Sequence, residues 1–388
     1  MSGRSSVALV NGRVLLDEGF VSDIAVLVEN GRIAGVVAES DGRARAARIH
    51  DLHGASLVPG FIDTQVNGGG GVLFNDVPTV EGIRCIAQAH RRFGTTGMLP
   101  TLISDDVEVM QRAIAAVEEA IEQGVPGILG IHLEGPYLAS ARKGVHDAAK
   151  FRLPDSREVE LASSLRGGRT LLTVAPEWIS AQTLHTLIER GVIVAAGHTA
   201  ASYDETRAAL SGGLRGFTHL YNAMTPLSGR EPGVVGAALD DRESWCGVIV
   251  DGHHVHPAAL RIALAAKPRG KVFLVTDAMP PVGSDSPTFR ISGTTATVKD
   301  GLLVTPAGTL AGSVLDMAQA VRNSVAWLGL PLAEAVRMAS TYPADFIGLG
   351  ATHGRIEAGC VADFVALDEE MRVRATWVAG VHEAYGVG

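Results

Sequence analysis

The sequence predicts an α/β protein, a (β/α)8 TIM barrel with a small β-sandwich domain formed by both chain termini. Between residue 57 and about residue 349, eight short apolar runs alternate with helix-length amphipathic stretches, the pattern of a parallel sheet built from βα units. The composition agrees, because 46% of residues are hydrophobic, only 5% are aromatic and 46 are glycine. A chain of 388 residues also exceeds the usual size of one core, which favours a second, smaller domain.

The small domain is expected at residues 1–56 plus 350–388, and the barrel at residues 57–349. Residues 6–56 alternate apolar runs with Asn-Gly pairs, at Asn11-Gly12 and Asn30-Gly31, which is the signature of β-hairpins with type I′ turns. The same texture returns after residue 350. The two ends of the chain are therefore expected to pair in one small β domain.

The eight expected barrel strands are residues 56–63, 95–102, 127–134, 170–177, 192–199, 215–220, 246–252 and 271–277. Eight such strands within about 300 residues are typical of a closed barrel. An open doubly wound sheet is the alternative. It is disfavoured because no GxGxxG motif follows a strand, and the glycines at 68–71 lack that spacing.

Charge and cysteine usage exclude several classes of partner. The formal charge is -9 and no Lys/Arg cluster is present, so no nucleic-acid or anionic-membrane partner is expected. Cys85, Cys246 and Cys360 are far apart and form no CxxC, which favours a reducing compartment over disulfides or a thiolate metal site. The N-terminus lacks the apolar segment of a signal peptide, and no membrane-length apolar run follows. We expect a soluble, cytoplasmic protein.

In a barrel of this kind the active site lies at the C-terminal ends of the strands. Polar residues gather at those ends in this sequence. They are Gln65, Asn67, Thr101, Glu134, Glu177, His198, His219, Asp251, His254 and Asp277.

Glu134, His198 and His219 form a candidate metal-ligand set. Each ends an apolar run, and one carboxylate with two imidazoles suits Zn²⁺ while leaving a position for water. For any single histidine, an ordinary polar residue at a strand end is the commoner explanation. Three such residues on strands 3, 5 and 6 favour a metal site.

Asp277 and His254 are the candidate catalytic residues. Asp277 follows four apolar residues, where a carboxylate could take a proton from water and later protonate a leaving amine. Taken alone, a turn-capping role for Asp277 is equally compatible with the sequence. His254 could polarise a substrate carbonyl. The adjacent His253 and His256 are expected to be ordinary loop residues.

The stretch "HLYNAMTPLSGREPG" places Asn222 and Arg230 in a candidate anion pocket, because guanidinium and amide groups can bind phosphate. A solvated surface arginine is the alternative. His132 faces the same side as Glu134 and is expected in the barrel interior rather than among the ligands. Lys143 and His146, in "ARKGVHD", are expected to be solvated.

The motifs "PGFIDTQVNG", "HLEGPYL", "VAPE", "GHTAA", "HLYNAM", "VDGHHV", "VTDAM" and "GTLAGS" together resemble one family. It is the N-acetylglucosamine-6-phosphate deacetylase family of the amidohydrolase superfamily. The resemblance covers essentially the whole chain, and the combined motif set is much narrower than the general barrel pattern.

The resemblance implies hydrolysis of the acetamide of N-acetylglucosamine 6-phosphate by a homodimer with a metal in each barrel. Glu134, His198 and His219 match the metal ligands of the family, and Asp277 matches its catalytic acid/base. The matching substrate contacts are Val145, Asn222, Ala223, Arg230, His254, Leu310, Ala311 and Gly312. Arg230 is also expected to serve the site of the neighbouring subunit.

The sequence departs from the superfamily at strand 1, where His-x-His is replaced by Gln65 and Asn67. Neutral amides are weaker Zn²⁺ ligands than imidazoles. We therefore expect one divalent metal ion per subunit, Zn²⁺. Two alternatives stay open, a different amidohydrolase reaction such as cyclic-amide or D-amino-acid amide hydrolysis, and a non-catalytic barrel protein. The second is disfavoured because such relatives typically lose a ligand or the last-strand aspartate.

Overall fold

The computed structural model describes residues 6–291, 294–306, 308 and 310–386. Contacts between Cα atoms divide the chain into two compact units. The first comprises Met1–Ile62, His90–Gly97 and Met317–Gly388, and the second comprises Asp63–Ala89 and Met98–Asp316.

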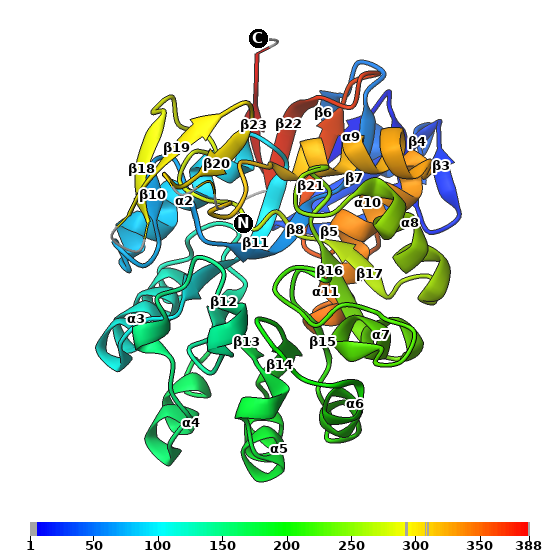
Figure 1. Cartoon of the computed structure of the whole chain (residues 1–388). Helices are drawn as coiled ribbons and strands as arrows, with labels where there is room; N and C mark the ends of the chain where they lie inside the picture. The colour runs from blue at the N-terminus through cyan, green and yellow to red at the C-terminus, as the bar shows by residue number, and fades with distance from the viewer. Residues whose placement is uncertain (1–5, 292–293, 307, 309, 387–388) are drawn as a thin grey trace. The chain divides into compact units, whose positions relative to one another are not determined.

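The first unit contains two β-sheets. One has the strand order β5-β4-β1-β6, with bounds Arg32–Ala38, Ile24–Glu29, Val7–Val10 and Arg48–Asp51. The other has the order β23-β22-β21-β7-β2-β3, with bounds Val381–Ala384, Val373–Val378, Phe364–Leu367, Ser56–Pro59, Arg13–Leu16 and Gly19–Val21. The C-terminal strand β21 pairs antiparallel with the N-terminal β7, so the chain ends share one sheet (Figure 1).

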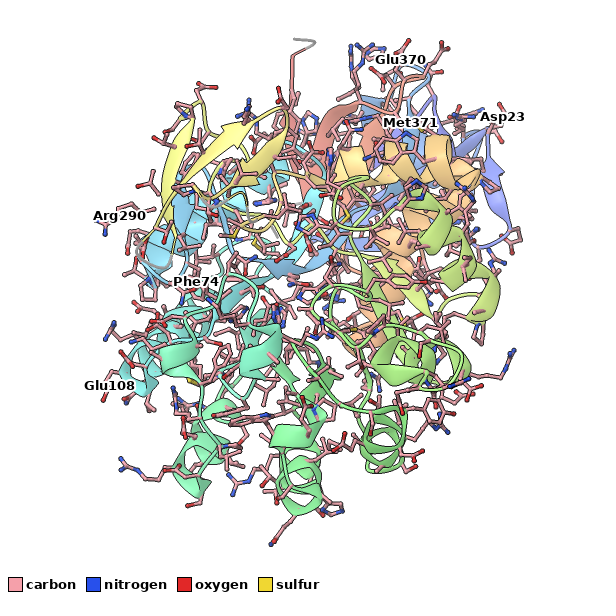
Figure 2. All side chains as sticks on the ribbon, in the orientation of Figure 1. Asp23, Phe74, Glu108, Arg290, Glu370 and Met371 are labelled. Carbon is pink, nitrogen blue, oxygen red and sulfur yellow. The ribbon has the colours of Figure 1, made fainter. Side chains whose placement is uncertain are left out.

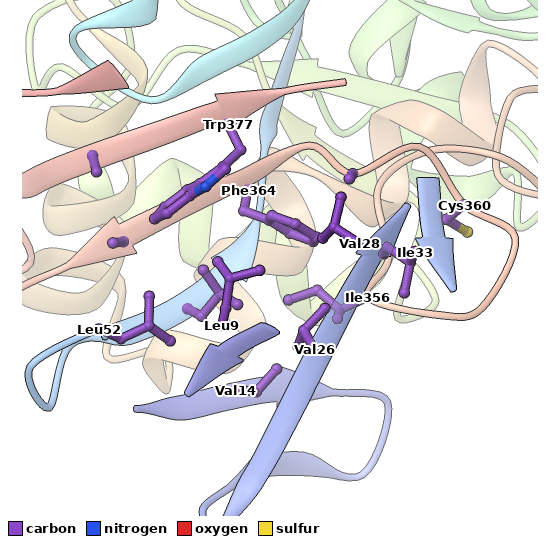
Figure 3. Packing of buried hydrophobic residues seen from close by; sticks show 14 residues of the cluster. Leu9, Val14, Val26, Val28, Ile33, Leu52, Ile356, Cys360, Phe364 and Trp377 are labelled. Carbon is purple, nitrogen blue, oxygen red and sulfur yellow. The ribbon is translucent and has the colours of Figure 1, made fainter. Parts of the chain in front are cut away.

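A shared core joins these two sheets. Leu9, Val26 and Val28 of one sheet pack with Phe364 and Trp377 of the other in a single buried apolar cluster (Figure 3). Burying side chains from two facing sheets is how a β-sandwich is stabilised. The predicted small β-sandwich built from both termini is confirmed.

The two Asn-Gly pairs have different outcomes. Asn30 and Gly31 both have positive φ and join β4 to β5 as the predicted hairpin. The hairpin predicted at Asn11-Gly12 is wrong, since β1 pairs with β4 and β6 whereas β2 pairs with β3 and β7. There the chain passes from one sheet to the other, and a Cβ on Gly12 would lie 2.7 Å from Ala55 O.

The first unit also contains four helices among its described residues. They are α1 (Gly42–Ala46), α9 (Met317–Leu328), α10 (Leu332–Ala339) and α11 (Thr341–Phe346). The last three lie in the part of the chain that the sequence assigned to the barrel domain. Compact units and domains are defined by different criteria, so the domain boundaries near residues 56 and 350 stay a prediction.

The second unit is built around an eight-stranded parallel sheet with the order β17-β16-β15-β14-β13-β12-β11-β8. A parallel bridge between Val66, at the end of β8, and Ala278, after β17, closes this sheet on itself. Figure 1 shows the successive strands β12 to β15 side by side. Closure confirms the predicted (β/α)8 barrel over an open doubly wound sheet. In chain order the strands are β8 (Phe61–Val66), β11 (Thr95–Ile103), β12 (Gly130–Glu134), β13 (Arg169–Val174), β14 (Ile193–Ala196), β15 (Gly216–Phe217), β16 (Trp245–Val248) and β17 (Val272–Leu274).

Helices alternate with these strands, as the amphipathic stretches predict. Two begin with a capping box, at Asp155 before α4 and at Ser202 before α6. Figure 2 shows Glu108 extending outwards in the first turn of α3, where a negative charge suits the helix dipole. In the described residues, every helix falls short of what a membrane crossing requires in length and apolar character. The helices are α2 (Val80–Arg91), α3 (Val107–Glu122), α4 (Ser156–Ala162), α5 (Ala181–Glu189), α6 (Tyr203–Ser211), α7 (Gly233–Asp240) and α8 (Pro257–Ala266).

The first expected strand, residues 56–63, is two strands in the structure. It divides at Pro59-Gly60, where β7 ends before β8 begins. Proline lacks the N–H that a central strand needs. A Cβ on Gly60 would lie 1.9 Å from Thr96 Oγ1, so the backbone can pass here only as glycine.

An antiparallel insertion follows β17 and was not predicted from the sequence. Its strands are β18 (Thr288–Ile291), β19 (Thr294–Lys299) and β20 (Leu302–Val304). Phe289 and Leu303 of the insertion pack with Leu73, Met279 and Ala311 in a separate buried cluster. Leu73 belongs to a short hairpin of β9 (Gly68–Gly69) and β10 (Val72–Leu73).

Candidate active site

The barrel brings Glu134, His198 and His219 together, although 85 residues separate the first from the last. Glu134 Oε1 lies 3.1 Å from His198 Nε2 and 3.0 Å from His219 Nε2. The two Nε2 atoms are 3.1 Å apart. All three side chains are buried, and one ligand atom from each lies within 4.8 Å of the others.

The chemistry of these atoms fits a cation. His198 Nδ1 donates to the carbonyl oxygen of Arg142 over 2.8 Å, so in a neutral ring Nε2 carries a lone pair and no proton. That lone pair faces a carboxylate oxygen, and two acceptors at 3.1 Å repel unless a positive charge lies between them. The group therefore fits a divalent metal ion held by one oxygen and two nitrogens.

The ionisation of Glu134 agrees with this role. Burial opposes ionisation of Glu134, but hydrogen bonds from His198 and His219, made when those rings carry a proton on Nε2, hold the pKa of Glu134 well below its usual range. Burial likewise disfavours a charged His219, yet its hydrogen bond with Glu134 leaves the pKa of His219 raised. Glu134 thus stays ionised in a dry environment, where its attraction for a cation is strong.

The segment after β12 positions His198 from two directions. Arg142, at the end of the 3-10 helix η1 (Ser140–Arg142), accepts from the His198 ring. Ala139 N–H donates to the backbone oxygen of His198 over 2.9 Å. Gly144 then turns with φ +55, and a Cβ there would lie 3.1 Å from the His198 ring. A partner for the second ring nitrogen fixes the tautomer of a metal-ligating histidine.

His146 is a correction to the sequence analysis, because it is buried rather than solvated. It is 2% exposed, its ring lies 4.4 Å from that of His198, and its Nδ1 lies 2.8 Å from Ser104 Oγ. Burial, with the nearby His198, lowers the pKa of His146 to about 3. The charges in "ARKGVHD" suggested solvent, and no sequence signal shows that the turn at Gly144 directs this side chain inwards. Lys143 is exposed, as predicted.

Asp277 faces Gln65 and Asn67 across the seam of the barrel, where the end of β8 meets the segment after β17. Its Oδ1 accepts from Asn67 Nδ2 at 2.7 Å and from Gln65 Nε2 at 3.0 Å. Burial, and then the charge of Glu134, raise the pKa of Asp277 to about 6, against the effects of His219, His254 and the Asn67 bond. A carboxyl group that titrates near neutral pH can both take and return a proton.

Asp63 links the two sides of the same seam through hydrogen bonds, and the sequence analysis did not select it. It is fully buried on β8, and its Oδ1 accepts from the backbone N–H groups of Gln65 at 3.1 Å and Thr276 at 3.3 Å. The hydroxyl of Thr276 donates to its Oδ2 at 2.5 Å. Burial raises the pKa of Asp63 to about 7, although these hydrogen bonds oppose the shift.

Replacing Asp63 with asparagine is expected to flatten the dependence of stability on pH. The unfolded chain releases this proton near pH 3.9, whereas the folded chain keeps it to about pH 7. Proton binding therefore stabilises the folded state fully below about pH 4, and this contribution is lost as the pH rises towards 7. Asparagine cannot titrate. From pH 5 to pH 8 the free energy of unfolding of D63N should therefore rise relative to that of the parent by about 1 to 4 kcal/mol.

Denaturant unfolding of both proteins at the two pH values measures this difference. Asp285→Asn, at an exposed position, is the control for loss of a carboxylate. A constant difference between D63N and the parent at both pH values would contradict the assignment of a buried, protonated Asp63.

His254 is oriented by Asp251. Its Nδ1 lies 2.6 Å from Asp251 Oδ2, and its backbone N–H donates to Asp251 Oδ1. Burial opposes ionisation of Asp251, but the bond from the His254 side chain leaves the pKa of Asp251 lowered. His253 is exposed, and His256 caps α8 by accepting from Ala258 N–H, which agrees with the loop roles predicted for both.

The three predicted residues in the loop after β15 differ in what they contact. Asn222 Nδ2 donates to the backbone oxygen of His219, and Ala223, with φ +51, accepts from Thr199 N–H. Both therefore brace the loops that carry the two histidines. Arg230 is exposed, and its side chain makes no hydrogen bond or ion pair with the described residues. The structure does not bring Arg230 to the metal group.

Glu177 braces the loop after β14. Its two carboxylate oxygens accept from the Thr199 hydroxyl and the Ala200 N–H, each at 2.6 Å. It lies in the 3-10 helix η3 (Pro176–Trp178) that follows β13.

The remaining predicted substrate contacts lie at the insertion. Val145 packs against the buried cluster that contains Ala311 and Met279. Leu310 forms a bridge to Val304 of β20, and a Cβ on Gly312, which has φ +74, would lie 2.4 Å from Met279 Cγ. The insertion thus supports both segments that the resemblance places beside the sugar.

His132 lies in the barrel interior, as predicted. It is fully buried, with Nε2 2.8 Å from Thr173 Oγ1 and Nδ1 3.3 Å from Thr101 Oγ1. Thr173 in turn lies 2.7 Å from Thr218. These polar contacts cross the barrel from β11 to the segment after β15 and leave His132 outside the metal group.

Comparisons with known proteins agree with this geometry. N-acetylgalactosamine-6-phosphate deacetylase from Shewanella sp. (strain ANA-3) is 45% identical over 96% of this chain and 95% of its own. The crystal structure of N-acetylglucosamine-6-phosphate deacetylase from Pasteurella multocida matches with a TM-score of 0.94 at 35% identity, over 98% of this chain and 100% of that chain. A Mycobacterium smegmatis enzyme of the latter name, a mutant in complex with N-acetyl-D-glucosamine-6-phosphate, matches with a TM-score of 0.88 at 33% identity, over 98% and 99% of the two chains.

A closed barrel with a carboxylate and two imidazoles converging at the strand ends defines a metal-dependent hydrolase of the barrel type. Residues 56–382 match the Amidohydrolase family. With this match and the relatives above, the chain belongs to the amidohydrolase family.

Proposed function

We propose that this chain hydrolyses the acetamide of N-acetyl-D-glucosamine 6-phosphate to D-glucosamine 6-phosphate and acetate, using one Zn²⁺ per subunit. The observation that carries the proposal is the position of Asp277. Gln65 and Asn67 hold it, and the same Gln65 Nε2 also lies 3.2 Å from Glu134 Oε1 in the candidate metal group. Similarity to deacetylases of N-acetylhexosamine 6-phosphates supports the substrate class.

In the proposed reaction, Asp277 takes a proton from the attacking water and delivers it to the nitrogen of the leaving amine. Glu134, His198 and His219 would hold a divalent ion, and that ion would supply Lewis acidity towards the water and the acetyl carbonyl. His254 points its Nε2 away from Asp251 and, when the ring carries both protons, can donate to the carbonyl oxygen. The bond broken is the C–N bond of the acetamide, and the products are acetate and a free amine.

The sugar phosphate is proposed to lie among Val145, Asn222, Ala223 and the Leu310–Gly312 segment, with Arg230 binding the phosphate. The guanidinium of Arg230 is exposed, which suits a phosphate that is bound in the barrel of the neighbouring subunit. Leu227, in the same loop, is 55% exposed, and a partner subunit would cover it. We therefore propose a homodimer in which Arg230 of each subunit reaches the site of its neighbour.

A second candidate substrate is N-acetyl-D-galactosamine 6-phosphate, which differs only in configuration at C4. The specific observation that favours it is the 45% identity to a relative of that name. The chemistry at Asp277 is the same for both epimers, so the choice depends on contacts to the sugar ring rather than on the metal group.

Release of acetate from both epimers, each with and without the phosphate, tests the proposal. We expect kcat/KM to fall by about 100-fold or more without the phosphate, because a bidentate contact worth roughly 3 kcal/mol is lost. Higher kcat/KM for the galactosamine epimer would reassign the substrate within the same reaction. Equal rates without the phosphate would favour another amidohydrolase reaction, and no release from any sugar would favour the non-catalytic alternative.

The proposed place of action is the cytoplasm. Cys85, Cys246 and Cys360 are free thiols in the structure, which is the state that a reducing compartment maintains.

A further inference from the structure

Three alternate side chains from one strand reach the same two residues across the barrel seam. Asp63 and Gln65 lie on β8 and Asn67 follows it, so at this spacing all three face the same side. Asp63 holds Thr276, while Gln65 and Asn67 hold the neighbouring Asp277. The backbone is tied as well, because Asp277 N–H donates to Gln65 O at 3.0 Å.

The two amides converge on a single carboxylate oxygen. Asn67 and Gln65 both donate to Asp277 Oδ1, and among the described residues none donates to Oδ2. The orientation of the Asn67 amide follows from its partner, since a flipped amide would place two oxygens 2.7 Å apart. This orientation is kept even though it leaves the buried Asn67 Oδ1 without a partner in the described structure.

We propose that Gln65 and Asn67 are positioning residues for Asp277, holding Oδ1 so that Oδ2 is the oxygen that moves the proton. The inference rests on the proposed deacetylation. A carboxylate free to rotate would present either oxygen in many directions, whereas two donors on one oxygen fix the plane of the group. Amide N–H groups also offset negative charge where Asp277 lies near Glu134.

Asn67→Leu removes the shorter of the two bonds and keeps the number and branching of the side-chain heavy atoms. We expect kcat to fall by roughly 10- to 100-fold, the cost typical of a misplaced catalytic group. KM and the metal content should stay at the parent values, because Asn67 touches neither the proposed sugar contacts nor the three ligand atoms. Asn75→Leu is the matched control, since Asn75 also donates an amide N–H to a carboxylate, Asp105, but away from Asp277. It should keep the parent kcat.

The decisive measurement is the kcat of the double variant N67L/D277N, compared with the kcat of D277N alone. If Asn67 acts through Asp277, N67L should not lower the residual kcat of D277N any further. An equal fall in both backgrounds would overturn the proposal, as would a rise in KM alone or a loss of metal from N67L.

A crystal structure of metal-loaded N67L provides a readout that does not depend on turnover. The Asp277 carboxylate should leave its present orientation, and an unchanged orientation would overturn the positioning role. If the parent releases no acetate from either sugar phosphate, the proposed function fails. If the parent is active and N67L matches it, only the inference fails.

Discussion

Asp277→Asn is expected to retain its metal and lose turnover by roughly 10²- to 10⁴-fold, the usual contribution of a general acid–base residue. Asparagine keeps the shape of the side chain and can still accept at Oδ1 from Gln65 and Asn67. It cannot take a proton from water or return one to the amine. The metal content should not change, because Asp277 is outside the ligand group.

The pH profile separates this role from a structural one. In the parent, kcat should rise with pH through about 6, as Asp277 loses the proton that burial and Glu134 favour. D277N should lack that rise. Asp285→Asn, at an exposed carboxylate, is the control. Near-normal turnover in D277N would contradict the acid/base role assigned to Asp277.

Removing the metal is expected to abolish deacetylation, and graded return of Zn²⁺ should restore it at about one ion per chain. The reason for one ion is the donor set. Glu134, His198 and His219 converge, whereas Gln65 and Asn67 direct N–H groups at Asp277 and Glu134 instead of lone pairs at a second ion. Metal content and acetate release, measured on the same samples, test this stoichiometry.

His219→Ala should lose both metal and activity, because two ligands bind far more weakly than three. His185→Ala, on the exposed face of α5, is the matched control and should behave as the parent. Saturation at about two ions per chain would show that the strand-1 amides do contribute to a second site.

Much of the fold could be predicted from the sequence, because periodicity is local. All eight barrel strands appear where short apolar runs predict them, and the Asn30-Gly31 hairpin follows from two adjacent residues with positive φ. The Asn11-Gly12 hairpin was wrong because the same pair also suits a crossing between two sheets. The β18–β20 insertion was missed since a short antiparallel sheet has no signal that separates it from the surrounding loops.

The candidate site shows the same division. Glu134, His198, His219 and Asp277 could be selected from the sequence because each ends an apolar run, and parallel strands place their C-terminal ends on one rim. His146 could not be selected. Its burial depends on a turn at Gly144 and on contacts to Ser104 and His198, which are distant in the sequence.

The sequence by itself thus determined the strands, the residue types at their ends and the family, since these depend on neighbours along the chain. Only the tertiary structure decided which oxygen of Asp277 receives both amides, which nitrogen of His198 faces Glu134, and that Asp63 is buried at the seam. Hydrogen bonds depend on distance and direction over a few ångströms. Residues 210 positions apart, such as Asn67 and Asp277, meet that condition only after the barrel closes.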